Sequence, residues 1–144
     1  MLDPELVQKI KSLRLEFKDR QQPELLIKIP NNLSKNEVVI HRTEEFTSLC
    51  PLNPSQPDYA TIEIAFKPIT SLVELKSLKL YLVSYRMVRV FHEDVPRLVL
   101  NDLLPILGDI ELGVKGRFST RGGLYSTVVS YNGMENYRWL MNQA

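Results

Sequence analysis

The spacing of apolar residues predicts three amphipathic helices. The first is expected over residues 4–17, where the apolar positions fall on one helical face: Leu6, Val7, Ile10, Leu13 and Phe17. Asp3 followed by Pro4 is typical of a helix start, with an N-cap and then proline at the first helical position. The same three- and four-residue spacing predicts helices over residues 72–86 and 92–107, the last ended by Pro105 and Gly108.

Alternation of side chains predicts four strands. In the clearest, residues 59–67, one face is apolar and is expected to be buried: Ala60, Ile62, Ile64 and Phe66. The other strands are expected over residues 37–42, 110–118 and 124–131, with a turn at 120–123 between the last two. Residues 43–58 are expected to form a proline-stiffened loop, which could hold Cys50 in one geometry because fewer backbone states must be frozen.

The order of these elements predicts an α+β fold. Two strands, two helices and two further strands follow the first helix, and such blocks favour an antiparallel sheet with helices on one face. The length of 144 residues is that of one domain. A four-stranded sheet leaves both edges open, and open edges favour pairing with another copy of the chain.

Composition narrows the range of partners. A formal net charge of +1 gives no support to non-specific binding of nucleic acid or a membrane surface, so a small molecule or another protein chain is expected. No apolar run approaches the roughly 18 residues of a membrane span, and the N-terminus lacks signal-peptide character, so a cytoplasmic location is expected. One cysteine excludes an internal disulfide and a zinc site of several thiolates, and no metal is expected.

Two short segments carry candidate catalytic groups. Cys50 could act as a nucleophile if Asp58 accepted its proton and later returned it to a developing nitrogen anion. His92 could exchange protons near neutral pH, and Glu93 could bind a flat heterocycle through paired N–H groups. The alternatives are a packed cysteine beside a turn-capping aspartate, and acidic residues that favour a helix N-terminus.

Basic residues offer a candidate phosphate site. Lys76 and Lys79 share a helix face, and Arg86 and Arg121 could join them from other segments. A solvated charged face is the alternative. The chain has no G-x-G-x-x-G after a strand and no P-loop, so any nucleotide must be bound by another device.

Four blocks in order resemble one family. The run at 74–81, Glu-Leu-Lys-Ser-Leu-Lys-Leu-Tyr, matches the signature of the 7-cyano-7-deazaguanine reductases, which reduce a nitrile with NADPH on the route to the modified tRNA base queuosine. Residues 44–58 resemble the nucleophile loop of that family, and residues 91–94 and 121–123 resemble its later blocks. Asp58 follows Cys50 by eight residues, one more than in the usual short loop, and residues 1–35 form an N-terminal helix and irregular extension outside these blocks.

The resemblance implies a fold and a set of roles. The fold would be the tunnel fold, a ββααββ unit in one domain over residues 1–144, with subunits forming rings of five that stack in pairs. The reductase would take the free cyano-deazaguanine, without direct contact to nucleic acid. The implied catalytic residues are Cys50 as the nucleophile that forms a thioimide, Asp58 as the proton donor and His92 as its assistant.

The implied binding residues fall into two groups. The substrate group consists of Glu93, Phe91, Glu74 and Ser77. The NADPH group consists of Lys76, Ser77, Lys79 and Arg121. Lys76, Ser77 and Lys79 favour the reductase over similar archaeal amidinotransferases, which act on the nitrile in tRNA and lack this signature. Two further alternatives are GTP cyclohydrolase I, whose zinc ligands are absent here, and a non-catalytic ring-forming protein.

Overall fold

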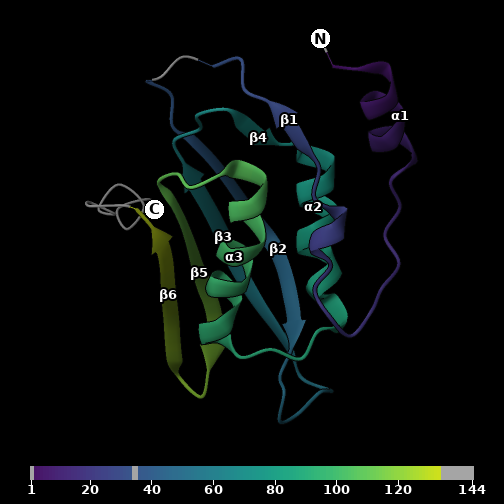
Figure 1. Ribbon diagram of the computed structural model, residues 1–144. Helices are drawn as coiled ribbons and strands as arrows, with labels where there is room; N and C mark the ends of the chain where they lie inside the picture. The colour runs from purple at the N-terminus through teal and green to yellow at the C-terminus, as the bar shows by residue number, and fades with distance from the viewer. Residues whose placement is uncertain (1, 34–35, 134–144) are drawn as a thin grey trace.

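A computed structural model describes residues 2–33 and 36–133 (Figure 1). Its main sheet contains β2 (Val39–Leu49), β3 (Pro57–Phe66), β5 (Leu112–Arg121) and β6 (Leu124–Asn132). The strands are antiparallel and lie in the order β2-β3-β5-β6. Two helices, α2 (Leu75–Val83) and α3 (Val95–Leu107), cover one face of this sheet (Figure 1). The predicted α+β class is confirmed.

The core lies between this face of the sheet and the two helices. Ile62, Ile64 and Phe66 of β3 are at most 1% exposed, as the alternation predicted. The opposite face of β3 is less exposed to solvent than the alternating sequence pattern predicts. Glu63 is 1% exposed there, and its carboxylate lies 2.6 Å from a guanidinium nitrogen of Arg117 on β5.

Hydrogen bonds between two tyrosine hydroxyl groups and an aspartate carboxylate connect α2 and the turn that follows it to α3. The Tyr81 hydroxyl donates to an Asp102 carboxylate oxygen at 2.6 Å and lies 2.9 Å from the Tyr85 hydroxyl. Both tyrosines are fully buried, and burial raises the pKa of each phenol. Burial also raises the pKa of the Asp102 carboxyl group, although the hydrogen bond from Tyr81 opposes this shift.

The start of α2 differs from the prediction because residues 71–73 form a strand. In the structure β4 (Ser71–Val73) pairs with β1 (Lys28–Pro30) in a second, two-stranded sheet. Glu74 then caps α2, its carboxylate accepting from the backbone N–H of Lys76 at 2.8 Å and of Ser77 at 2.7 Å. After Val83 the chain tightens into the 3₁₀ turn η2 (Ser84–Met87). The leucine spacing therefore located α2 but placed its start three residues too early.

The predicted loop over residues 43–58 is wrong. β2 continues to Leu49 and β3 begins at Pro57, so that only residues 50–56 connect them. The β2–β3 register shifts between Thr43 and Phe46, which is a β-bulge. A bulge adds one residue to one strand and breaks the two-residue alternation, which explains why the sequence pattern did not indicate a strand there.

The N-terminal helix is shorter than expected. α1 (Pro4–Ser12) begins as predicted, with the Asp3 side chain accepting from Glu5 N–H at 2.8 Å, but the backbone becomes extended at Leu13. The ammonium group of Lys76 donates to the carbonyl oxygens of Ile10 at 2.9 Å and Lys11 at 3.3 Å, at the last turn of α1. Since carbonyl groups of the last helical turn lack intrahelical partners, α2 thereby supplies donors to the end of α1.

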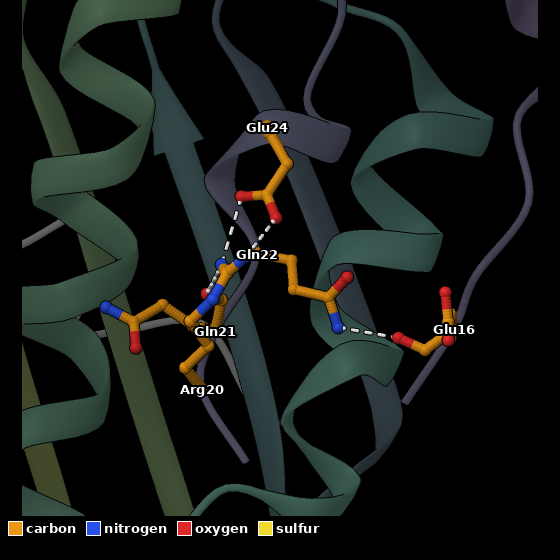
Figure 2. A network of polar contacts seen from close by, with 5 residues as sticks. All are labelled: Glu16, Arg20, Gln21, Gln22 and Glu24. Carbon is orange, nitrogen blue, oxygen red and sulfur yellow. Dashed lines mark hydrogen bonds and ion pairs between the residues drawn. The ribbon is translucent and has the colours of Figure 1, made fainter. Parts of the chain in front are cut away.

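The segment after α1 is held by a buried glutamine and an exposed ion pair (Figure 2). The Gln22 side-chain amide donates to the Glu16 carbonyl oxygen at 2.8 Å, and Gln22 is 3% exposed. Arg20 contacts both carboxylate oxygens of Glu24, at 2.8 and 3.2 Å, and donates to the Gln21 carbonyl at 3.0 Å. Half-exposed ion pairs contribute little, so Gln22 is the stronger tie. The short 3₁₀ helix η1 (Pro23–Leu25) follows.

The last predicted helix is confirmed with a 3₁₀ start. η3 (His92–Asp94) leads into α3, and Gly108 ends α3 with a φ of 89°, a conformation that favours glycine. Within the described ranges, no helix combines the length and apolar character needed to cross a bilayer.

Candidate active site

A pocket of about 210 Å³ lies where the 50–56 connection, η3 and the β5–β6 turn meet, at the lower end of the sheet in Figure 1. Its lining residues are Cys50, Pro51, Asp58, Val90, Phe91, His92, Glu93 and Arg121. Six of these were nominated from the sequence, and they come from four separate segments. The fold therefore gathers the candidate nucleophile, acid, imidazole and substrate-binding carboxylate around one space.

Asp58 is the buried charge of this pocket. It is the second residue of β3 and is 4% exposed. Arg121 Nη2 donates to its Oδ1, and His92 Nε2 lies 3.3 Å from its Oδ2. A buried carboxylate is costly unless it is paired and hydrogen-bonded, and Asp58 has a partner on each oxygen.

His92 is positioned by an aromatic residue that the sequence did not single out. Its ring stacks on Phe118 of β5, with centroids 4.1 Å apart and planes 10° apart. The Phe118 ring lies close over Gly116, where an added Cβ would be 2.8 Å from Phe118 Cε2. Burial lowers the pKa of the His92 imidazole, while the charge of Glu93 opposes the shift. The neutral ring is therefore favoured and can accept a proton.

Cys50 is the first residue after β2 and is partly exposed. Its own N–H donates to the Gln56 carbonyl at 3.2 Å, and Gln56 N–H donates to the Asn53 carbonyl at 2.9 Å, which closes the connection into a compact turn. The backbone N–H groups of Asn53 and Leu52, together with the positive charge of Arg121, lower the pKa of the thiol. A lowered pKa increases the thiolate fraction, and the thiolate is the nucleophilic form.

Ser48 is a buried polar residue that the sequence did not indicate. It pairs with Asp58 across β2 and β3 and is completely buried. Among the described residues its hydroxyl has no hydrogen-bond partner. An unsatisfied buried hydroxyl next to a site carboxylate is an expensive feature that no sequence pattern reveals.

Phe91 and Glu93 lie at the mouth of the pocket. Phe91 is 48% exposed and Glu93 is exposed, although both line the pocket. An aromatic face and a carboxylate that are open to solvent can contact an entering flat heterocycle without first losing an internal partner.

The residues nominated from the 74–81 run do not reach this pocket. Glu74 is the N-cap of α2, and Lys76 binds the end of α1. Ser77 is completely buried, with its hydroxyl donating to the Glu74 carbonyl at 2.7 Å and accepting from Ile27 N–H at 3.0 Å. α2 begins beside β4, at the end of the sheet away from the end of β2 (Figure 1), and Cys50 directly follows β2. In this chain the Glu74 and Ser77 side chains hold the start of α2 and lie away from the candidate substrate pocket.

Lys79 lines a second groove of about 210 Å³ between β2 and α2. The walls are largely apolar, with Leu75, Leu78 and Leu82 from α2, and His41 and Arg42 stand on the strand side. Lys79 is exposed, so its ammonium group is open to a ligand in solution.

Together, these features define a small α+β protein with an antiparallel sheet, helices on one face of it, and a thiol, a carboxylate and an imidazole around one pocket. The family described as QueF-like protein matches residues 57–137. The chain belongs to this family.

Several curated relatives share one name. NADPH-dependent 7-cyano-7-deazaguanine reductase from Bacillus velezensis is 44% identical over 103 residues, which cover 71% of this chain and 62% of that enzyme. The enzymes of that name from Bacteroides fragilis and Porphyromonas gingivalis are each 39% identical over 112 residues, 77% of this chain and 74% and 72% of theirs. The match thus spans less than two thirds of the Bacillus enzyme.

A solved structure is similar in fold. The apo form of the archaeosine synthase QueF-Like superposes with a TM-score of 0.62 and 20% identity, covering 69% of this chain and 96% of that one. At this identity the similarity concerns the fold alone.

Proposed function

We propose that this protein reduces the nitrile of 7-cyano-7-deazaguanine to an aminomethyl group with NADPH, in the synthesis of queuosine in tRNA. The observation that carries the proposal is the gathering of Cys50, Asp58, His92 and Glu93 around one pocket. Relatives named for this reaction are 39–44% identical over most of the chain. The substrate is the free base, and the reaction takes place in the cytoplasm.

The first step joins Cys50 to the substrate. The Cys50 thiolate adds to the nitrile carbon, one C–N π bond breaks, and the nitrogen takes a proton to give a thioimide. Asp58 delivers a proton that it has taken up from His92, which lies 3.3 Å from its second oxygen and, being partly exposed, regains a proton from solvent. Glu93 accepts from the paired N–H groups of the heterocycle while Phe91 packs against its face.

Reduction requires two hydride equivalents, which NADPH supplies when bound. Uptake of one hydride and one proton would convert the thioimide to a tetrahedral adduct, which would expel the Cys50 thiolate and leave a protonated imine. A second hydride would convert this protonated imine to the amine with no further proton. Asp58 and His92 supply protons to the nitrogen in turn, and Cys50 ends as the thiolate with which it began.

The basic residues of α2 fit a nucleotide phosphate in chemistry. Lys79 is exposed beside a groove whose apolar walls suit a flat ring, and Lys76 is one turn away. Lys76 already donates to two carbonyl oxygens of α1, which leaves one of the three N–H donors of its ammonium group for a phosphate. Lys76 and Lys79 would hold the phosphates, and Ser77 supports them by fixing the start of the helix.

The distance between the two sites favours an assembly. Lys76 lies near the start of a nine-residue helix whose far end leads to the segment beside Leu49 and Cys50. At 1.5 Å per residue α2 is roughly 13 Å long, so most of that length separates Lys76 from the end of α2 that leads toward its own pocket, whereas Arg121 lines that pocket. A neighbouring copy of the chain in a tunnel-fold ring brings a second set of basic residues to each pocket.

The test combines the protein, cyano-deazaguanine and NADPH, with the absorbance of reduced nicotinamide as readout. The expected result is consumption of two NADPH per nitrile, lost in Cys50→Ala. Formation of a covalent adduct by mass spectrometry without NADPH consumption would favour the amidinotransferase alternative. If Cys50 forms no adduct and no NADPH is consumed, the proposal is wrong.

A further inference from the structure

The side chain of Arg121 points toward the pocket from a turn whose backbone conformation favours glycine. Arg121 is the last residue of β5 and is paired with Leu124 of β6 across Gly122 and Gly123. These glycines have φ values of 54° and 82°, in the left-handed region that other residues rarely adopt. The hairpin therefore fixes the backbone from which the guanidinium reaches Asp58.

Arg121 is committed to two of the reacting groups. Its Nη2 donates to Asp58 Oδ1, and Asp58 turns its other oxygen toward His92. The positive charge of Arg121 also acts on the Cys50 thiol. The cluster of basic residues and the family resemblance both pointed to a phosphate as its partner, whereas the geometry pairs Arg121 with the buried carboxylate in the pocket that Cys50 also lines.

The charged groups around Cys50 show what the positive charge of Arg121 does in this pocket. The groups that face it are Asp58 from β3, His92 and Glu93 from η3, and Arg121 from β5. Arg89, in the segment that bridges to Leu49, is exposed to solvent. Two carboxylates would oppose a thiolate at this position, and Arg121 is the fully charged cation lining the described pocket that offsets them.

We propose that Arg121 is a positioning residue that pairs with Asp58, aims the other oxygen of Asp58 at His92, and places its positive charge in the pocket that Cys50 lines. This assignment rests on the proposed function for its purpose, because it prepares both the nucleophile and the proton carrier of that reaction. The contacts themselves exist without substrate or cofactor, so they can be tested alone.

The experiment measures the rate of alkylation of Cys50 by iodoacetamide as a function of pH, without substrate or NADPH. Cys50 is the only cysteine, so every label reports on it. In Arg121→Gln the pH at which the alkylation rate is half-maximal is expected to rise. A rise of about one unit in the pKa of Cys50 cuts its thiolate fraction near neutral pH roughly tenfold. Arg121→Lys keeps the positive charge but lacks the planar set of guanidinium donors, so its midpoint is expected to lie between that of Arg121→Gln and that of the unaltered protein.

Two further variants control for folding and for general charge effects. The double variant Asp58→Asn/Arg121→Gln also removes the buried carboxylate that has lost its arginine partner, and its alkylation midpoint is expected below that of Arg121→Gln. Lys67→Gln removes an exposed charge that pairs with Glu111 beyond the other end of β3, and its midpoint is expected to equal that of the unaltered protein. Circular dichroism verifies that each variant is folded.

An unchanged alkylation midpoint in folded Arg121→Gln overturns the proposal, and so does a midpoint in folded Arg121→Lys that is shifted as far as that of Arg121→Gln. An increased KM for NADPH with an unchanged alkylation profile also overturns it and assigns Arg121 to the cofactor. If the unaltered protein consumes no NADPH while the midpoint still shifts, Arg121 keeps this role and the proposed reaction fails instead.

Discussion

Replacing Ser77 with alanine tests whether the 74–81 run stabilises the folded protein in the absence of any ligand. The Ser77 hydroxyl accepts from Ile27 N–H at 3.0 Å inside the protein, 50 residues away in the chain. Alanine removes that acceptor and leaves the buried N–H without a partner. The Glu74 carbonyl is less affected, because it still accepts from Leu78 N–H at 3.0 Å.

The expected cost follows from this one orphaned donor. An unsatisfied buried N–H costs about 1–3 kcal/mol in the free energy of unfolding. With a denaturant dependence of about 1–3 kcal/mol per molar urea, the unfolding midpoint should fall by roughly 1 M. Far-UV circular dichroism in urea, at one fixed protein concentration and without NADPH, measures the shift.

Lys79→Ala is the matched control. Lys79 belongs to the same run and the same helix but is exposed, so its loss should change the free energy of unfolding by less than about 0.5 kcal/mol. If Ser77→Ala unfolds at the same urea concentration as Lys79→Ala, the hydroxyl does not hold Ile27, and the reasoning from its burial is refuted.

Three further predictions follow from contacts described above. Ser48→Ala should leave the urea midpoint unchanged or raise it, because the buried hydroxyl gains no hydrogen bond from the described residues, and a fall of 1 kcal/mol or more would show a hidden partner. Lys76→Met should release α1, seen as faster proteolysis within residues 2–12 while the urea midpoint stays nearly constant, and equal cleavage rates would contradict the role of the ammonium group. Because burial raises the pKa of Asp102, the native state holds that proton more tightly than the unfolded state, and this contribution to stability disappears as pH rises through the folded pKa. Asp102→Asn should therefore be more stable relative to the unaltered protein at neutral pH than at pH values below about 3.9, the ordinary pKa of aspartate, and a pH-independent difference would refute the assignment.

The sequence predicted the layered fold because periodicity reports burial directly. The helices predicted from leucine spacing and the strand predicted from alternation, α2, α3 and β3, are present in the structure. Each pattern marks a single face of an element that packs on the core. The N-terminal part of the fold was harder to predict. Leu13 and Leu15 fit an extended chain as well as a helix, and residues 71–73 became a strand because of a partner more than 40 residues away.

The candidate site was predictable in composition but not in arrangement. Resemblance nominated Cys50, Asp58, His92 and Glu93, and the fold places them around one pocket, while their roles remain predictions. Stacking of Phe118 on His92 and the pairing of Arg121 with Asp58 depend on β5 lying beside β3. Such contacts arise from tertiary packing, which leaves no local signal in the chain.

The orientation of the His92 imidazole also depends on Gly116, a residue outside the pocket. A methyl group at this position would meet the Phe118 ring, and that ring is the surface on which His92 rests. Larger residues at 116 would push the ring outward and tilt the proton carrier without touching any reacting atom. Activity would then be adjustable from the middle of a strand, so a search for altered pH optima could begin at 116 rather than among the polar groups.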